Sequence, residues 1–156
     1  MDDRGVEQRA LFRRWPTGVS VVVAETGGRR AGLTVNSLVS LSLEPPLVGI
    51  SLALSASLYE VLREAGEWTA SMLAADQDHL AQHFSRSVPP LVLWDGIDVR
   101  TDDPRLLEGA AGWLHARTVD EIAAGDHTVF IGEVERVEHG PGRGALVYLG
   151  REYRAL

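Results

Sequence analysis

The sequence predicts a mainly β domain with short helices, in which about six or seven antiparallel strands form a small barrel. Three observations support this fold class: β-branched apolar runs recur along the chain, glycine-rich turns separate them, and only short stretches have helical periodicity. The 156 residues suit one domain, so residues 1–156 are expected to fold as a single unit. A flat open sheet would leave long edges unprotected, which favours a barrel.

The N-terminal part of the chain predicts one helix and a β-hairpin. Residues Val6 to Arg14 suit a short amphipathic helix, which Trp15-Pro16 should end because the residue before proline avoids the helical conformation. The β-branched run from Val19 to Glu25 predicts the first strand. A second strand is expected from Ala31 to Val39, and Thr26-Gly27-Gly28 supplies the turn between the two.

The middle of the chain predicts a strand, a helix and another strand. Leu47 to Leu52 is apolar and follows a double proline, so it is expected to be a strand. Ser57 to Ala65 predicts a helix, with Ser57 as N-cap and Glu60 completing a capping box. Gly66 is the expected C-terminal stop, and Trp68 to Leu73 is the next strand.

The C-terminal half predicts a short helix and then β-structure again. The helix covers Asp76 to Phe84, and the strands cover Gly112 to Ile122, His127 to Val137 and Ala145 to Leu149. The glycine-rich segment Gly140 to Gly144 has no helix after it, unlike a dinucleotide fingerprint, so it is interpreted as a hairpin turn.

Composition excludes several kinds of chemistry. The chain has no cysteine, which removes disulfides, thiolate catalysis and cysteine metal sites, and no lysine, which removes Schiff-base chemistry and a phosphate-loop lysine. The net charge of −7 and the scattered arginines argue against nucleic acid as a partner. The apolar runs are too short for a membrane span and the charged N-terminus does not resemble a signal peptide, so a cytoplasmic location is expected.

Polar residues gather at two places in the sequence, and each group has two possible interpretations: part of a binding site, or ordinary residues of a helix cap or loop. Thr34, Asn36 and Ser37 lie near the end of a predicted strand, and Ser55 and Ser57 lie at the start of a predicted helix. Hydroxyl, amide and backbone N–H groups placed there could hold a phosphorylated ligand without lysine. The alternative is that Ser57 only caps its helix and the other residues line a loop.

Three histidines allow further alternatives. His127 opens a predicted strand, where it could hydrogen-bond a ligand amide or carry a proton, or could be a surface residue beside a turn. His79 and His83 share one helix face at metal-binding spacing, but they lack the glutamate of HExxH. A solvated helix face is the favoured reading for this pair, and no metal site is predicted.

Short motifs, each weak alone, occur together in an order that resembles one family. They are Pro16-Thr17-Gly18-Val19, Gly32 to Ser37, Ser42 to Val48, Ser55-Ala56-Ser57, Asp76 to Phe84, Gly125-Asp126-His127 followed by Phe130 to Val134, and Tyr148 to Tyr153. From about Phe12 to Arg154, the chain resembles the short-chain flavin reductases, the small components of two-component flavin-dependent monooxygenases.

The resemblance implies an FMN-binding split β-barrel with NAD(P)H-dependent flavin reductase activity. Hydride would pass from NADH or NADPH to FMN or FAD, and the reduced flavin would go to a partner monooxygenase. A homodimer with the flavin near the subunit interface is also implied, with nicotinamide docking beside His127. The positions that match the family's flavin contacts are Thr34, Val35, Asn36, Ser37, Ser51, Leu52, Ser55 and Ser57.

The chemistry implied by the resemblance agrees with the composition. Hydride transfer between two bound rings needs positioning, so no acid, base or nucleophile is expected from the chain. The alternative is a flavin-binding or carrier protein on the same barrel that does not oxidise NAD(P)H and does not need His127; a barrel that binds haem is less favoured. Asn36, where the family more often has serine, leaves the choice between FMN and FAD open, and the sequence does not separate NADH from NADPH.

Overall fold

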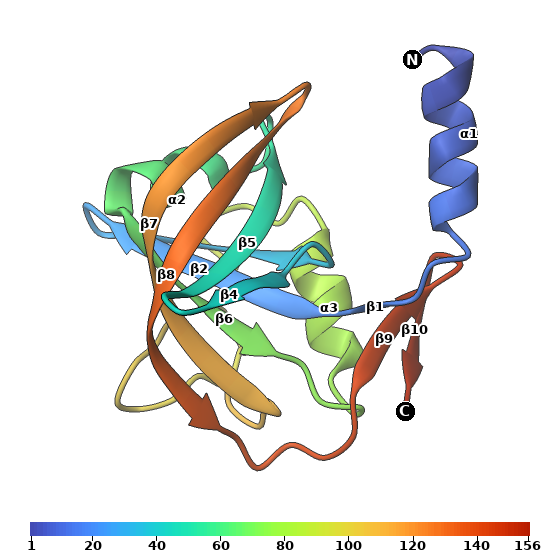
Figure 1. The fold of residues 1–156 in the computed structure, drawn as a ribbon. Coiled ribbons are helices and arrows are strands. Elements are labelled where there is room, and N and C mark those ends of the chain that lie inside the picture. Colours follow the sequence, from blue (N-terminus) through green and yellow to red (C-terminus); the bar gives the residue numbers. More distant parts are fainter.

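Ten strands and three helices make up the fold in the computed structural model, which describes residues 1–156 (Figure 1). The helices are α1 (Asp3–Phe12), α2 (Tyr59–Ala65) and α3 (Asp78–Ser85). The strands are β1 (Thr17–Gly18), β2 (Ser20–Thr26), β3 (Arg29–Val35), β4 (Val39–Leu43), β5 (Pro46–Ala53), β6 (Glu67–Met72), β7 (Gly112–Ala124), β8 (His127–His139), β9 (Leu146–Leu149) and β10 (Glu152–Ala155).

Seven strands form one antiparallel sheet that curls into an incomplete barrel. Their order is β3-β2-β6-β7-β8-β5-β4, and β3 and β4 do not pair with each other, so the sheet has two free edges. Strands β1, β9 and β10 form a separate small sheet at one side (Figure 1). The predicted class, a split barrel with short helices and about seven antiparallel strands, is confirmed for the large sheet; the small sheet was only partly foreseen.

The predicted strand from Ala31 to Val39 is wrong in its second half. Strand β3 ends at Val35, and Val39 begins a different strand, β4, which lies at the opposite edge of the sheet beside β5. Between them, the Ser37 side chain is hydrogen-bonded to the backbone of Ser51. The apolar pattern continues across this crossover, which is why periodicity alone does not reveal it.

Two apolar clusters fill the fold. The first lies between α2 and one face of the large sheet and includes Leu62, Trp68 and Phe130. The second lies between α3, the segment that follows it and the small sheet, and includes Phe84 and Leu107. Phe84 of this second cluster lies against Gly32 of β3, so α3 is packed on the strand whose end carries the polar residues.

The predicted capping box at the start of α2 is wrong. The helix begins at Tyr59 with Leu58 as N-cap, and no side chain caps it. A tight turn instead precedes the helix, in which the Ala56 N–H donates to Ala53 O and the Tyr59 N–H donates to Ala56 O. Ser57 therefore keeps an exposed hydroxyl free of internal hydrogen bonds. The predicted stop is confirmed, because Gly66 has φ 71° and its N–H donates to Leu62 O.

The segment Gly140 to Gly144 is not the predicted hairpin turn. It carries the chain from β8 in the large sheet to β9 in the small sheet, and these strands do not pair. Its glycines allow close approach: a Cβ at Gly142 would lie 2.6 Å from the Ala74 Cβ, and one at Gly140 would overlap Ala110 O. The glycines thus serve the packing of two backbones.

Candidate functional site

The end of β3 is fastened to β5 through one serine. The Ser37 Oγ donates to Ser51 O at 3.1 Å and accepts from Ser51 N at 3.0 Å. The backbone N–H and C=O of Ser51 are thereby both paired with a single side chain, although the two residues are 14 positions apart. Two segments that match the family's flavin contacts, Thr34 to Ser37 and Ser51 to Ser57, are brought together in this way.

Two neighbouring residues at the same strand end have different roles. The Thr34 Oγ1 donates to Ala81 O at 2.7 Å, so this hydroxyl ties β3 to α3. Asn36 is exposed, and its amide makes no hydrogen bond within the chain. It lines a hollow of about 320 Å³, together with Ser85, Tyr148 and Tyr153. The amide of Asn36 is therefore free to meet a ligand, whereas Thr34 acts in the framework.

Tyr148 and Tyr153 belong to the last of the motifs that resemble the family, but the sequence alone assigns no role to either side chain. Their rings lie 5.3 Å apart, tilted by 47°, and come from β9 and β10 of the small sheet. Burial is the main cause that raises the pKa of the Tyr153 phenol, so it stays protonated at neutral pH. Both tyrosines line the same hollow as Thr34 and Asn36, so they lie beside the end of β3 although they are more than 100 residues away in the sequence.

Two predicted contact residues point their side chains into the core. Leu52 is 1% exposed and Val35 is 7% exposed, and both belong to the main apolar cluster. Only their backbone groups are available to a ligand. Ser55 and Ser57, in contrast, are exposed on the turn before α2 and make no internal hydrogen bonds.

His127 lies beside the same turn. It is the first residue of β8 and pairs with Ala53, and the Leu54 N–H donates to Asp126 O at 3.0 Å. The His127 Nδ1 lies 2.7 Å from Asp126 Oδ1, and 44% of the imidazole is exposed. This hydrogen bond is the main cause that lowers the pKa of the Asp126 carboxyl, which stays ionised at neutral pH.

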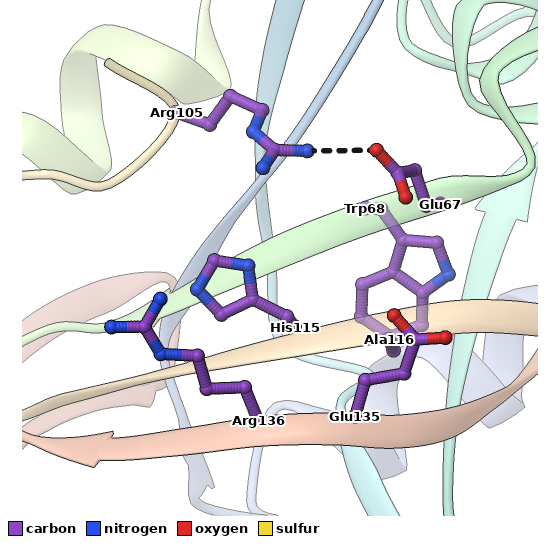
Figure 2. Close-up of a pocket in the computed structure, with 7 residues that line it drawn as sticks. All are labelled: Glu67, Trp68, Arg105, His115, Ala116, Glu135 and Arg136. Atoms are coloured by element: carbon purple, nitrogen blue, oxygen red, sulfur yellow. Dashed lines mark hydrogen bonds and ion pairs between the residues drawn. The ribbon is translucent and has the colours of Figure 1, made fainter. Parts of the chain in front are cut away.

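A separate polar pocket of about 200 Å³ lies on the large sheet, away from every predicted site residue (Figure 2). Its charged groups neutralise one another: Arg105 contacts Glu67 at 3.3 Å and Asp103 at 2.9 Å. His115 projects between Arg105 and Arg136, and its buried Nε2 has no hydrogen-bond partner. No hydride chemistry follows from this balanced cluster.

This pocket has a consequence for stability. Burial is the main cause that lowers the pKa of His115 below 6.5. The positive charges of Arg105 and Arg136 lower this pKa further, whereas the negative charge of Asp103 raises it. Below pH 6.5 the unfolded chain therefore takes up a proton that the folded chain resists, so stability falls with pH. Urea unfolding from about pH 8 to about pH 5 should show a flatter profile for His115→Gln than for the unaltered protein. An equally steep profile in the variant would contradict the role of His115.

The chain is similar to known proteins over nearly its whole length. Residues 12–156 match the family described as "Flavin reductase like domain". An NADH:FMN oxidoreductase of Rhodococcus erythropolis is 36% identical over 157 residues, which cover 95% of this chain and 80% of that protein. The reductase component of 4-hydroxyphenylacetate 3-monooxygenase from Thermus thermophilus is 37% identical over 149 residues, covering 95% and 94%.

Solved structures give the same picture of the fold. The NADH:FAD oxidoreductase SgcE6 of Streptomyces globisporus superposes with a TM-score of 0.90 and 33% identity, covering 99% of this chain and 94% of that one. BorF, the flavin reductase component of a bacterial two-component tryptophan halogenase, gives a TM-score of 0.85 and 31% identity over 99% and 98%. In this chain, none of the three helices has the length and apolar character needed to cross a bilayer.

Proposed function

Because the chain belongs to the flavin reductase-like domain family, we propose that it is an NADH-dependent flavin reductase that reduces FMN or FAD. The observation that carries this proposal is the family match over residues 12–156, which includes every site segment described above. The reduced flavin passes to a flavin-dependent monooxygenase, as the name of the Thermus relative suggests. We further place the protein in the cytoplasm, where NADH is regenerated.

The residues at the strand end fit a flavin. The Asn36 amide and the Ser55 and Ser57 hydroxyls are exposed and have no partner within the chain, so they can hydrogen-bond the polar ring edge and the ribityl phosphate. Val35 and Leu52 place buried apolar side chains behind this rim, with only their backbones towards it. The arrangement supports the predicted contacts without requiring a lysine.

When bound, flavin and nicotinamide supply the hydride acceptor and the hydride donor. The protein contributes by holding the two planar rings close together in the orientation that hydride transfer needs. Ser37 fixes the distance between β3 and β5. Ionised Asp126 accepts the Nδ1–H of His127, which leaves Nε2 as an acceptor for the amino group of a carboxamide.

The direct test is to follow NADH consumption with FMN and then with FAD. Loss of NADH absorbance that depends on both protein and flavin is expected. Protein that binds flavin but consumes neither NADH nor NADPH would overturn the proposal in favour of the flavin carrier. A visible spectrum of the purified protein separates both from a haem-binding barrel.

His127→Ala is expected to raise the KM for NADH about fivefold to tenfold, because it removes one hydrogen bond to the carboxamide. Flavin affinity, measured by quenching of flavin fluorescence, should change less. His139→Ala is the matched control, since His139 is exposed at the other end of the same strand. An unchanged KM would leave His127 without a role in nicotinamide docking.

We propose that the protein works as a homodimer, with α1 of one copy packed on the other. No residue of α1 is buried, and the helix stands away from the sheet (Figure 1). Leu11, Phe12 and Trp15 are 60–65% exposed and contiguous, and Leu43 on the edge strand β4 is 87% exposed. An isolated ten-residue helix is marginal in water, so a partner surface is needed to stabilise it.

The double variant Phe12→Ser with Trp15→Ser should raise the dimer dissociation constant at least about tenfold, because two large apolar side chains no longer leave water. Sedimentation velocity over a range of concentrations measures this shift. Gln8→Ala, which changes an exposed polar residue of the same helix, is the control. A double variant that stays dimeric at the same dilution as the control would contradict the assignment.

A further inference from the structure

Helix α2 and strand β8 are joined by a hydrogen bond between two buried hydroxyl groups. The Tyr59 Oη lies 2.8 Å from the Thr128 Oγ1, and these residues are 8% and 5% exposed. No other hydrogen bond in the chain joins two buried side chains. Because a buried hydroxyl without a partner is costly, this pair holds the start of the helix against the strand.

The other uncharged side chains that link separate elements near the site bond to the backbone instead. Thr34 and Ser37 do so at the end of β3. The His83 Nε2 lies 2.7 Å from Leu93 O, so His83 is a structural residue and the reading of a solvated helix face is wrong for it. A bond between two side chains differs from these, because it can be removed by changing either partner.

The Tyr59 hydroxyl closes one end of the turn before α2. At the start of this turn, the Leu54 N–H donates to Asp126 O at 3.0 Å. At its end, Tyr59 begins α2 and is hydrogen-bonded to Thr128. Asp126 and Thr128 are the two neighbours of His127 in the sequence. The turn is therefore attached at both of its ends to the residues that flank His127.

The turn depends more on these attachments than the strand does. Thr128 belongs to β8, which is paired with β5 on one side and with β7 on the other. The turn before α2 lies outside both sheets, and the exposed Ser55 and Ser57 hydroxyls make no hydrogen bond within the chain. If the bond to Thr128 is lost, we expect the turn to move and the strand to stay in place.

We propose that Tyr59 is a positioning residue for the flavin, an inference that rests on the proposed function. Its hydroxyl, paired with that of Thr128, fixes the turn before α2 so that Ser55 and Ser57 present their hydroxyls to the flavin. Nicotinamide docking depends on His127, which the pairing of β8 holds independently. Loss of the Tyr59 hydroxyl therefore weakens flavin binding and has little effect on nicotinamide docking.

The test removes each hydroxyl in turn. Tyr59→Phe keeps the ring, whose centre lies 5.5 Å from that of Phe130 in an edge-on contact, so this variant should fold. Thr128→Val removes the other hydroxyl and keeps the branched shape, whereas Thr128→Ser keeps the hydroxyl. Thr69→Val is the matched control, because Thr69 is fully buried and its Oγ1 donates to Arg105 O at 3.2 Å, away from the predicted contacts.

Flavin fluorescence measures the flavin dissociation constant, which should rise about fivefold to tenfold in Tyr59→Phe and in Thr128→Val. The double variant should be no weaker than the weaker single variant, because both changes break the same bond. Thr128→Ser and Thr69→Val should stay within about twofold of the unaltered protein, and so should the KM for NADH at saturating flavin in every variant. A control that loses as much thermal stability as Tyr59→Phe but keeps its flavin affinity separates positioning from general destabilisation.

Two results would overturn the inference. One is a flavin dissociation constant in Tyr59→Phe and Thr128→Val that stays within about twofold of that in Thr69→Val. The other is a rise in the KM for NADH as large as the rise in the flavin dissociation constant, since the effect would then not be confined to the turn. An unaltered protein that binds flavin but oxidises no NADH would refute the proposed function, while the flavin dissociation constants would still test Tyr59.

Discussion

Trp68→Ala is expected to lower the free energy of unfolding by about 3–5 kcal/mol, the usual range for removing a large buried aromatic side chain. Trp68 is 1% exposed and lies in the main apolar cluster. Its ring fills the space over Gly132, where an added Cβ would lie 2.9 Å from Trp68 Cζ2 and 2.9 Å from the Ala116 Cβ. The fit is close, so neighbouring residues cannot fill the cavity by small shifts.

Urea unfolding followed by far-ultraviolet circular dichroism measures this loss. Trp68→Phe should cost less, since it keeps part of the ring and also removes an indole N–H that is buried without a partner. Val137→Ala, at a β8 position that is 62% exposed, should change stability by no more than about 0.5 kcal/mol. If Trp68→Ala lowered the free energy of unfolding by no more than Val137→Ala does, the stability of this part of the sheet would not depend on the indole.

Ser37→Ala is expected to have the largest effect on flavin binding. The variant leaves the N–H and C=O of Ser51 without their partner, which should cost about 1–3 kcal/mol of stability. It also removes the only side-chain hydrogen bond between the end of β3 and β5, so the two polar segments are held together less firmly, by apolar packing alone. We expect the flavin dissociation constant to rise tenfold or more.

Flavin fluorescence measures the affinity, and Ser37→Thr, which keeps a hydroxyl, should restore most of it. Ser40→Ala is the matched control, because Ser40 is exposed on β4 and makes no hydrogen bond. Wild-type affinity in Ser37→Ala would mean that the flavin does not use the surface between these strands. That result would also remove the main structural support for the predicted contacts.

The sequence predicts the strands well where their apolar pattern is uninterrupted and fails where the chain changes partner. The predicted turn at Gly27-Gly28 is confirmed, since Thr26 pairs with Arg29 and both glycines have positive φ. A pair of glycines between two apolar runs predicts such a turn without knowledge of the tertiary structure. The break between β3 and β4 is missed, since the residues on both sides have the same apolar character. The segment at Gly140 is misread because its glycines respond to another backbone, Ala110, which no local pattern reveals.

The sequence also predicts some features of the candidate site correctly and misses others. Asn36, Ser55 and Ser57 are exposed and unpaired as a binding role requires, although the contacts themselves stay a prediction. Residue type alone does not tell that the hydroxyl of Thr34 is already used by α3, or that Leu52 faces the core. Both follow from which face of a strand is covered, and that depends on tertiary packing.

The small sheet has a consequence for how fast the protein folds. Strand β1 pairs with β9: Thr17 is paired with Tyr148 and Gly18 with Val147. The paired residues are therefore separated by most of the length of the sequence. Closing so long a loop costs entropy before any contact compensates for it, and such distant pairs form late in folding. The hollow beside Asn36 includes Tyr148, so it should be the last part of the site to form during refolding. Substitutions in β9 should therefore speed unfolding and leave the refolding rate almost unchanged.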